Sequence, residues 1–241
     1  MFYIRIAELL IQVINRYDFS RDCCRDYLVG DGKPDLVLQS TEEELHEAAS
    51  IIAGTSGATC SFDYAEFIRL HAMLYPLLPS FQAFWQHAVL VELDGNGYAF
   101  TAPSGYGKST HALLWKKWFS DKARIVNGDN PIFRLQDGVF YGYGTPWCGK
   151  ERFQENRRVP MKGLCYLKHG ESNSIRRMSK EMAFSQLLRQ NQWVLGRQKQ
   201  PDDYMQLLET FVEQVPVYEL TCNQDVEAAQ IAYEGMKHGG N

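Results

Sequence analysis

The sequence predicts an α/β fold, and three observations lead to that prediction. Runs of β-branched and aromatic residues, typical of strands, are interspersed with segments whose apolar residues recur at helical spacing. The chain has 241 residues, of which 45% are hydrophobic and 22% charged, so it can bury a sizeable core. A glycine-rich loop joins one predicted strand to one predicted helix, and loops of this kind carry binding sites in α/β proteins.

We divide the sequence into a small N-terminal α+β lobe, residues 1–82, and a larger domain, residues 83–241. The lobe is expected to contain a strand pair or short helix (2–13), a strand (35–39), a helix, a loop (54–61) and a second helix (62–78). Thr41 and Glu44 have capping-box spacing, so the first helix should begin after Thr41. Pro76 should stop the second helix. The role expected for this lobe is recognition of the substrate.

The larger domain mixes strands and helices. Its expected elements are strands at 87–93 and 98–102, a helix at 109–119, strands within 123–135 and 139–144, a polar loop at 145–158, a strand at 159–170, helices at 179–195 and 203–214, a strand at 215–220 and a last helix from about 225 to 236. The first two strands are separated by Asp-Gly-Asn-Gly, which supplies the positive φ angles of a tight hairpin turn. In the helix at 203–214, four apolar residues form one stripe: Tyr204, Leu207, Leu208 and Phe211.

Composition and charge exclude several classes of protein. The net charge of −4 gives no general electrostatic attraction to nucleic acid. No apolar run approaches the roughly 20 residues that span a bilayer, so no membrane association is expected. The apolar start of the chain carries Arg5, Glu8 and Arg16 and lacks a small-residue cleavage site. We therefore interpret it as part of the fold and not as a signal peptide, and we expect a cytoplasmic protein.

The cysteines predict neither a metal site nor disulfides. Six occur, at positions 23, 24, 60, 148, 165 and 222, and no pair has CxxC spacing. Scattered cysteines in a chain of this size suit a reducing compartment, where they act as small apolar residues.

The stretch TAPSGYGKST (101–110) predicts a phosphate-binding loop. It matches the pattern GxxxxGK[ST] except that Ala102 replaces the first glycine, which only opens the turn. Backbone amides in such a turn converge on phosphate oxygens, and the following helix adds partial positive charge at its N-terminus. Lys108 should reach the terminal phosphates of a nucleoside triphosphate, and the Ser109 hydroxyl should bind Mg²⁺. The residues expected to bind the nucleotide are Ser104, Gly105, Tyr106, Gly107, Lys108, Ser109 and Thr110. The alternative is an ordinary Gly/Ser turn that happens to precede Lys-Ser.

Asp129 is the first candidate for a catalytic group. It follows a β-branched run about twenty residues after the loop. A carboxylate at such a strand end can bind Mg²⁺ or take the proton from an acceptor hydroxyl. The alternative is that Asn127 and Gly128 merely form the turn of a hairpin.

His87 and the loop 145–158 are the other candidates. His87 opens the strand that leads to the phosphate loop, although a histidine in that place can equally be a solvated or packed residue. The loop holds six charged residues: Lys150, Glu151, Arg152, Glu155, Arg157 and Arg158. Such a loop is either simply solvated, or closes over phosphates so that an arginine stabilises charge in the transition state.

The segment HAVLVELDGNGYAFTAPSGYGKST (87–110) resembles the core of the HPr kinase/phosphorylase family. In that family a histidine opens a strand that leads, through a glycine turn and a second strand, to the phosphate loop. The resemblance covers about residues 85–220, and VPMKGLCYLKHGESNSIRRMSKEMAFSQLL (159–188) and GTPWCGKE (144–151) look like short homologues of the founding enzyme. It implies a P-loop fold related to phosphoenolpyruvate carboxykinase, with a mixed sheet core and flanking helices. It also implies ATP- and Mg²⁺-dependent phosphorylation of a serine on a small protein or peptide.

The resemblance assigns roles to four residues. Lys108, Ser109 and His87 match the family pattern, and Asp129 matches the second member of an Asp-Asp pair that acts as acid and base. Gly128 stands where the family has the first aspartate, and a glutamate-containing stretch of the family is replaced here by GTPWCGKERFQ (144–154). These departures leave a reverse phosphorylase activity open. They also leave open whether Glu151 replaces the family glutamate.

We therefore expect a kinase whose catalytic residues are Asp129, His87 and Lys108, and whose Mg²⁺ is held by Ser109 and Asp129. Two alternatives are a kinase for a small metabolite and a nucleotide-binding regulatory module without turnover. The expected partners are the nucleotide and a small protein or peptide acceptor, without nucleic acid or membrane. The sequence leaves the identity of the acceptor open, and also the oligomeric state, a homo-oligomer included.

Overall fold

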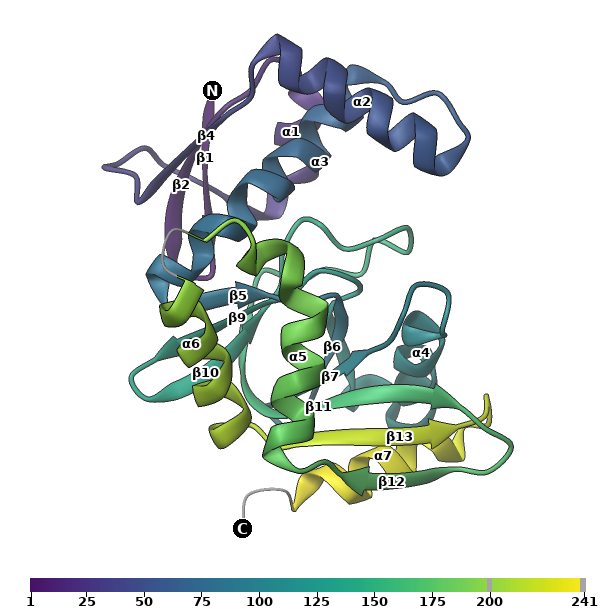
Figure 1. Ribbon diagram of the computed structural model, residues 1–241. Coiled ribbons are helices and arrows are strands. Elements are labelled where there is room, and N and C mark those ends of the chain that lie inside the picture. The colour runs from purple at the N-terminus through teal and green to yellow at the C-terminus, as the bar shows by residue number, and fades with distance from the viewer. Residues whose placement is uncertain (199–200, 239–241) are drawn as a thin grey trace. The chain divides into compact units, whose positions relative to one another are not determined.

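The computed structural model shown in Figure 1 describes residues 1–198 and 201–238. Tertiary contacts divide the chain into two units, Met1–Leu77 and Leu78–Asn241. The sequence analysis draws its boundary after residue 82, and its larger domain includes residues 199–200 and 239–241, which lie outside the described residues. The segment η2 (Tyr75–Phe81), a 3₁₀ helix, carries the chain from one unit to the other.

The first unit combines a sheet with helices. Its strands are β1 (Phe2–Ile6), β2 (Leu9–Ile14), β3 (Leu28–Val29) and β4 (Leu36–Gln39), in the spatial order β3-β1-β2-β4. Its helical segments are α1 (Asp18–Cys23), η1 (Arg25–Tyr27), α2 (Glu42–Ser56) and α3 (Phe62–Leu74). The segment 2–13 is a strand pair and not a helix, because every second residue of β1 is buried, which is the period of a strand.

Both helices expected in the first unit are present, but their ends differ from the prediction. The capping box is confirmed: Thr41 Oγ1 accepts a hydrogen bond from the Glu44 amide (3.2 Å), and Glu44 Oε2 accepts one from the Thr41 amide (2.9 Å). Helix α2 continues to Ser56 and ends at Gly57, whose φ of 68° lies in the left-handed region. The expected loop at 54–61 therefore begins too early. Helix α3 already ends at Leu74, and η2 takes up the rest of the predicted helix.

A buried carboxylate of α3 accepts hydrogen bonds from residues around the start of α1. Glu66 is 1% exposed, and its Oε1 accepts a hydrogen bond from the Arg16 amide at 2.7 Å. Its Oε2 accepts bonds from the Tyr17 amide (3.3 Å) and the Ser20 hydroxyl (3.0 Å). A negative charge at a helix N-terminus is favourable because unpaired amides and the helix dipole point toward it.

The second unit is built on a mixed sheet, as the sequence predicts. Its strands are β5 (Ala83–Trp85), β6 (Ala88–Leu93), β7 (Asn96–Thr101), β8 (Arg124–Asn127), β9 (Ile132–Gln136), β10 (Val139–Tyr143), β11 (Arg158–His169), β12 (Ser174–Arg177) and β13 (Val217–Cys222). They follow the order β5-β9-β10-β11-β7-β6-β8, and β13 pairs with both β11 and β12. Strand β11 pairs in parallel with β7 and β13 and antiparallel with β10, which makes the sheet mixed. The sequence did not predict the short strands β5 and β12.

Helices cover both faces of this sheet (Figure 1). They are α4 (Lys108–Phe119), with the short η3 (Ser120–Lys122) after it, α5 (Lys180–Leu195), α6 (Pro201–Gln214) and α7 (Glu227–Lys237). Helices α4 and α7 share one apolar cluster with Phe100 of β7 and Cys165 of β11. The next residues along these strands, Thr101 and Tyr166, face the other side, where both hydrogen-bond Gln190 of α5.

The apolar stripe predicted on α6 is confirmed. Tyr204, Leu207, Leu208 and Phe211 are all buried. The ring of Phe211 contacts three other rings, which come from β5, β9 and β10: Phe84, Phe133 and Phe140.

The cysteines are free thiols, as expected from their spacing. Cys24, Cys148, Cys165 and Cys222 are buried, and burial raises the pKa of Cys165 well above its ordinary value. Among the described residues, no helix has the length and hydropathy needed to cross a membrane.

Replacing Glu66 by alanine should lower the free energy of unfolding by about 2–3 kcal/mol, because two backbone amides and one hydroxyl lose their acceptor. Urea denaturation followed by circular dichroism measures this change. The matched control is Glu47→Ala, which removes an exposed glutamate from α2 and should change stability by less than about 0.5 kcal/mol. Equal effects of the two substitutions would contradict the role given to Glu66.

Candidate functional site

The predicted phosphate loop has the expected strand and helix on either side. Strand β7 ends at Thr101 and helix α4 begins at Lys108. Gly105 and Gly107 have φ angles of 80° and 83°, in the left-handed region that favours glycine. Gly107 is also the N-cap of α4, and no side chain caps this helix. The two glycines therefore shape a turn that leads directly into a helix start without a side-chain cap.

Ala102 is compatible with this loop, although the motif has glycine at its position. Its side chain is 2% exposed and belongs to the apolar cluster beneath α4. Its φ is not positive, so a Cβ causes no strain here. Its carbonyl oxygen accepts a hydrogen bond from Lys108 Nζ at 3.3 Å. The ammonium group of Lys108 is thus folded back over the loop.

Lys108 is close enough to Asp129 for their charges to interact. Its side chain is buried. Burial lowers the pKa of Lys108 below its ordinary value, while the nearby carboxylate of Asp129 acts in the opposite direction. A cation that is partly desolvated and next to one carboxylate can gain strongly from a phosphate oxygen.

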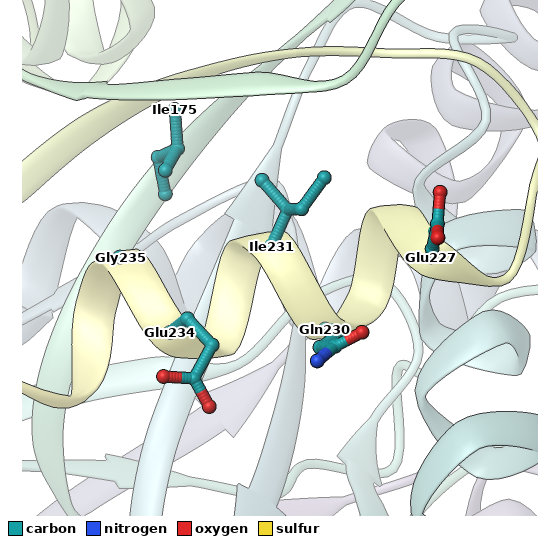
Figure 2. Close-up of a pocket in the computed structure, with 6 residues that line it drawn as sticks. All are labelled: Ile175, Glu227, Gln230, Ile231, Glu234 and Gly235. Atoms are coloured by element: carbon teal, nitrogen blue, oxygen red, sulfur yellow. The ribbon is translucent and has the colours of Figure 1, made fainter.

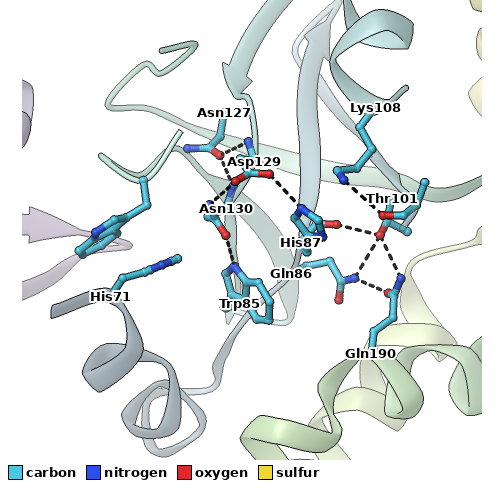
Figure 3. Close-up of polar contacts among 12 residues, drawn as sticks. His71, Trp85, Gln86, His87, Thr101, Lys108, Asn127, Asp129, Asn130 and Gln190 are labelled. Carbon is cyan, nitrogen blue, oxygen red and sulfur yellow. Dashed lines mark hydrogen bonds and ion pairs between the residues drawn. The ribbon is translucent and has the colours of Figure 1, made fainter. Parts of the chain in front are cut away.

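Asp129 and His87 are in direct contact, as Figure 3 shows. His87 Nε2 lies 3.0 Å from Asp129 Oδ1, and each side chain is about one third exposed, 34% and 33%. The backbone holds the two segments together as well, because the Ala88 amide donates to the Asp129 carbonyl oxygen at 3.0 Å. The three residues predicted to be catalytic, Lys108, Asp129 and His87, therefore lie in one region of the structure.

The second oxygen of Asp129 also has a partner (Figure 3). Asn130 Nδ2 donates to Asp129 Oδ2 at 2.8 Å, and Trp85 Nε1 donates to Asn130 Oδ1 at 2.8 Å. The carboxylate of Asp129 is thus oriented from both sides. Trp85 and Asn130 are not predictable from the sequence, because only the fold brings β5 next to this turn.

The turn that carries Asp129 is closed by a buried asparagine. Asn127 Oδ1 accepts hydrogen bonds from the amides of Asp129 (3.0 Å) and Asn130 (2.7 Å). Its Nδ2 donates to the Thr145 carbonyl oxygen at 2.9 Å. The alternative of a hairpin turn is wrong, because β8 pairs with β6, whereas β9 pairs with β5 and β10.

A glycine precedes Asp129 because there is no room for a side chain. A Cβ on Gly128 would lie 2.6 Å from the Cys148 carbonyl oxygen and 3.2 Å from Phe153 Cβ. The Gly128 amide donates to the Phe153 carbonyl oxygen at 2.9 Å, which holds the two segments together. The glycine at position 128 therefore has a local steric reason in this chain.

The loop 145–158 is not uniformly solvated, contrary to one of the two expectations. Its first part is buried, and Trp147 and Cys148 are 4% and 7% exposed. Two of its arginines are occupied elsewhere: Arg157 pairs with Glu92 and Glu155, and Arg158 lies over the ring of Tyr141.

Glu151 lies close to Asp129. A Cβ added to Gly149 would be 3.6 Å from both Asp129 Cγ and Glu151 Oε2, so the two carboxyl groups lie close to the same glycine. No cluster of three or more histidine, cysteine, aspartate or glutamate side chains suited to a metal occurs among the described residues. Mg²⁺ commonly uses one or two carboxylates together with substrate phosphates. Asp129 and the half-buried Ser109 fit that requirement, with Glu151 available nearby.

A cavity of about 880 Å³ opens beside the loop. Pro103 and Tyr106 of the loop form one wall together with His87. Helix α5 forms the opposite wall. Behind it, Gln190 Nε2 donates to Thr101 Oγ1 (3.2 Å), and Thr101 Oγ1 donates to the His87 carbonyl oxygen (2.8 Å), as Figure 3 shows. The sequence analysis missed Gln190 and Thr101, since residues far apart in the chain form this network.

A second depression, of about 560 Å³, lies where α7 meets β12 (Figure 2). Its lining residues are Ile175, Glu227, Gln230, Ile231, Glu234 and Gly235. It contains two carboxylates and no cation, so it opposes binding of a polyanion. None of the residues predicted from the sequence lines it.

Comparisons with known proteins add little to this site. No family model matches the sequence, and no curated protein matches it. The Hpr(Ser) kinase/phosphatase from Coxiella burnetii is a weak structural neighbour, with a TM-score of 0.30 and 15% sequence identity. The overlap covers 39% of this chain and 70% of that one. The structure supports a mixed α/β fold, and the function proposed next depends on the geometry of the site.

The substitution Gly128→Ala should lower the free energy of unfolding by about 1–3 kcal/mol, because the added methyl group meets a carbonyl oxygen of the backbone. Thermal and urea denaturation measure the change. Gly196→Ala is the control, since a Cβ there would be 3.4 Å from its nearest neighbour and its φ is −64°. If Gly128→Ala were no more destabilising than this control, the steric explanation would be wrong.

Proposed function

We propose that this chain is an ATP- and Mg²⁺-dependent kinase that phosphorylates a hydroxyl group, a serine, on a small protein or peptide. The observation that carries the proposal is the convergence of Lys108, Asp129 and His87 beside a glycine turn that opens a helix. Phosphoryl transfer requires positioning and charge neutralisation more than covalent chemistry from the protein. A phosphate loop with one buried cation and one oriented carboxylate supplies both.

The loop would bind the phosphates. Backbone amides of residues 104–109 and the start of α4 would surround the phosphate oxygens, and Lys108 would reach the terminal ones. The Ser109 hydroxyl and the Asp129 carboxylate would hold Mg²⁺, which neutralises charge on the β- and γ-phosphates. Glu151 would supply a second carboxylate to the same metal, since its side chain and Asp129 both lie close to Gly149.

Asp129 and His87 would handle the proton. In the transfer step the acceptor oxygen bonds to the γ-phosphorus while the bond from that phosphorus to the bridging oxygen of ADP breaks. The proton of the hydroxyl passes to the Asp129–His87 pair, directly to the carboxylate or through the imidazole. His87 lines the cavity, and Asp129 reaches the acceptor side through its contact with His87.

Two other functions use the same geometry. The cavity volume lies in the range of small-molecule sites, which supports a kinase for a small metabolite. The glycine at position 128 leaves a single aspartate in the turn, which supports a nucleotide-binding module without turnover.

Single-turnover transfer from labelled ATP separates the three functions. Transfer to peptides supports the proposal, equal transfer to free serine or a sugar alcohol supports the metabolite kinase, and ATP binding without transfer or hydrolysis supports the module.

Lys108→Ala should weaken ATP binding by at least about tenfold and abolish transfer, because a charge-assisted contact to phosphate is lost. Isothermal calorimetry with Mg²⁺ measures the affinity. Lys116→Ala removes an exposed lysine from the same helix and should leave the affinity unchanged. Should wild-type protein bind neither ATP nor GTP, the proposed function is overturned.

Asp129→Asn should lower turnover by about 100-fold or more, as expected for loss of a general base. ATP affinity should change little, because the amide oxygen of asparagine can still bind Mg²⁺. The matched control is Asp137→Asn in an exposed turn, where φ is 50° and asparagine is tolerated. Steady-state kinetics and calorimetry measure the two quantities separately. A parallel loss of Mg²⁺-dependent ATP binding would instead assign Asp129 to the metal alone.

A further inference from the structure

One face of α5 forms the cavity wall opposite the phosphate loop. The residues of α5 that line the cavity recur at helical spacing: Glu181, Met182, Ser185, Gln186, Arg189 and Gln190. A ligand in the cavity therefore has His87 and the phosphate loop on one side and a mostly polar helical stripe on the other.

Hydrogen bonds connect this stripe to the strands that carry the site. Gln190 Oε1 accepts a hydrogen bond from the Tyr166 hydroxyl at 3.1 Å, and Gln190 Nε2 donates to Thr101 Oγ1 at 3.2 Å. The next residue, Asn191, donates to Gln86 Oε1 at 3.3 Å. Since Gln86 and Thr101 adjoin His87 and Ala102 in the chain, α5 has a defined position relative to both the histidine and the loop.

Lysines and arginines outnumber glutamates by three to two among the residues that line the cavity. Lys168 and Arg176 share the single carboxylate of Glu219. Glu181, at the start of α5, also lines the cavity and keeps its negative charge, because hydrogen bonds from its own amide and Ser179 lower its pKa. Arg189, by contrast, forms no ion pair with any residue that the structure describes, and its side chain is exposed at the cavity. A guanidinium group in this situation is suited to a carboxylate, which it can bind through two parallel hydrogen bonds.

We infer that the acceptor is an acidic peptide, in which a carboxylate next to the accepting serine binds Arg189 while the serine hydroxyl lies beside His87. This inference rests on the proposed kinase function. Met178 and Met182 at the same wall favour a peptide over a small polar metabolite, because methionine offers adaptable apolar contact to neighbouring side chains. Met182 is 47% exposed, so this contact area is open.

Two blocked tripeptides test the inference: N-acetyl-Glu-Ser-Glu-amide and its isosteric neutral analogue N-acetyl-Gln-Ser-Gln-amide. Their affinities are measured by ligand-observed NMR in the presence of Mg²⁺ and a non-hydrolysable ATP analogue, so that the readout does not depend on turnover. We expect wild-type protein to bind the acidic peptide about tenfold more tightly, the effect of one charge-assisted pair.

Three variants show whether Arg189 causes the preference. Arg189→Gln should abolish it, and Arg189→Lys should retain part of it, because the charge remains while the two-pronged geometry is lost. Lys180→Gln removes the other cation of α5, which does not line the cavity, and should leave the preference unchanged.

Equal affinity for the two peptides, no binding of the acidic peptide, or a preference that survives Arg189→Gln would each overturn the inference. The proposed function fails by a different measurement, absence of ATP binding in calorimetry. Protein that binds ATP with Mg²⁺ but does not distinguish the peptides keeps the proposed function and loses only the acidic acceptor.

Discussion

The hydrogen bonds of the buried Asn127 side chain determine the geometry on which the candidate site depends. They close the turn at the end of β8, and β8 lies at the edge of the sheet beside β6. The turn therefore lies next to the start of β6, which His87 precedes. The carboxylate of Asp129 meets the imidazole because the backbone has already placed them side by side, with the Ala88 amide bonded to the Asp129 carbonyl.

The hairpin of β6 and β7 brings the third component to the same place. Ala88 is directly opposite Thr101, so the residue before β6 lies beside the loop that follows β7. The two-residue turn at Asp94 and Gly95, with φ angles of 51° and 75°, determines this register. His87 and Lys108 are 21 positions apart in the sequence (108 − 87). The pairing of β6 with β7 explains why His87 nevertheless lies close to the loop that Lys108 follows.

Close packing of backbone segments also explains why a glycine precedes Asp129. Gly128 is in contact with the Cys148 carbonyl, so a second aspartate in the turn would displace the buried part of the loop 145–158. The same loop brings Glu151 near Asp129, because both side chains lie close to Gly149.

Features that act between neighbours in the chain could be predicted from the sequence. The capping box at Thr41, the hairpin turn, the glycines of the phosphate loop and the apolar stripe of α6 each depend on residues a few positions apart, and their physical causes are local. The ends of α2 and α3 could not be placed as well, because several adjacent residues tolerate either helix or turn.

The tertiary structure alone decided which of these local pieces meet. Asp129 could be read equally as a catalytic carboxylate or a turn residue until β8 and β9 were seen to pair with different strands. Trp85, Asn130 and Gln190 carry no motif, and their roles follow from hydrogen bonds between segments far apart in sequence. The excess of cations at the cavity is likewise visible only once Lys168 and Arg176 are seen to share Glu219. A sequence specifies local conformation through adjacent residues, whereas proximity across the sheet arises from packing of the whole domain.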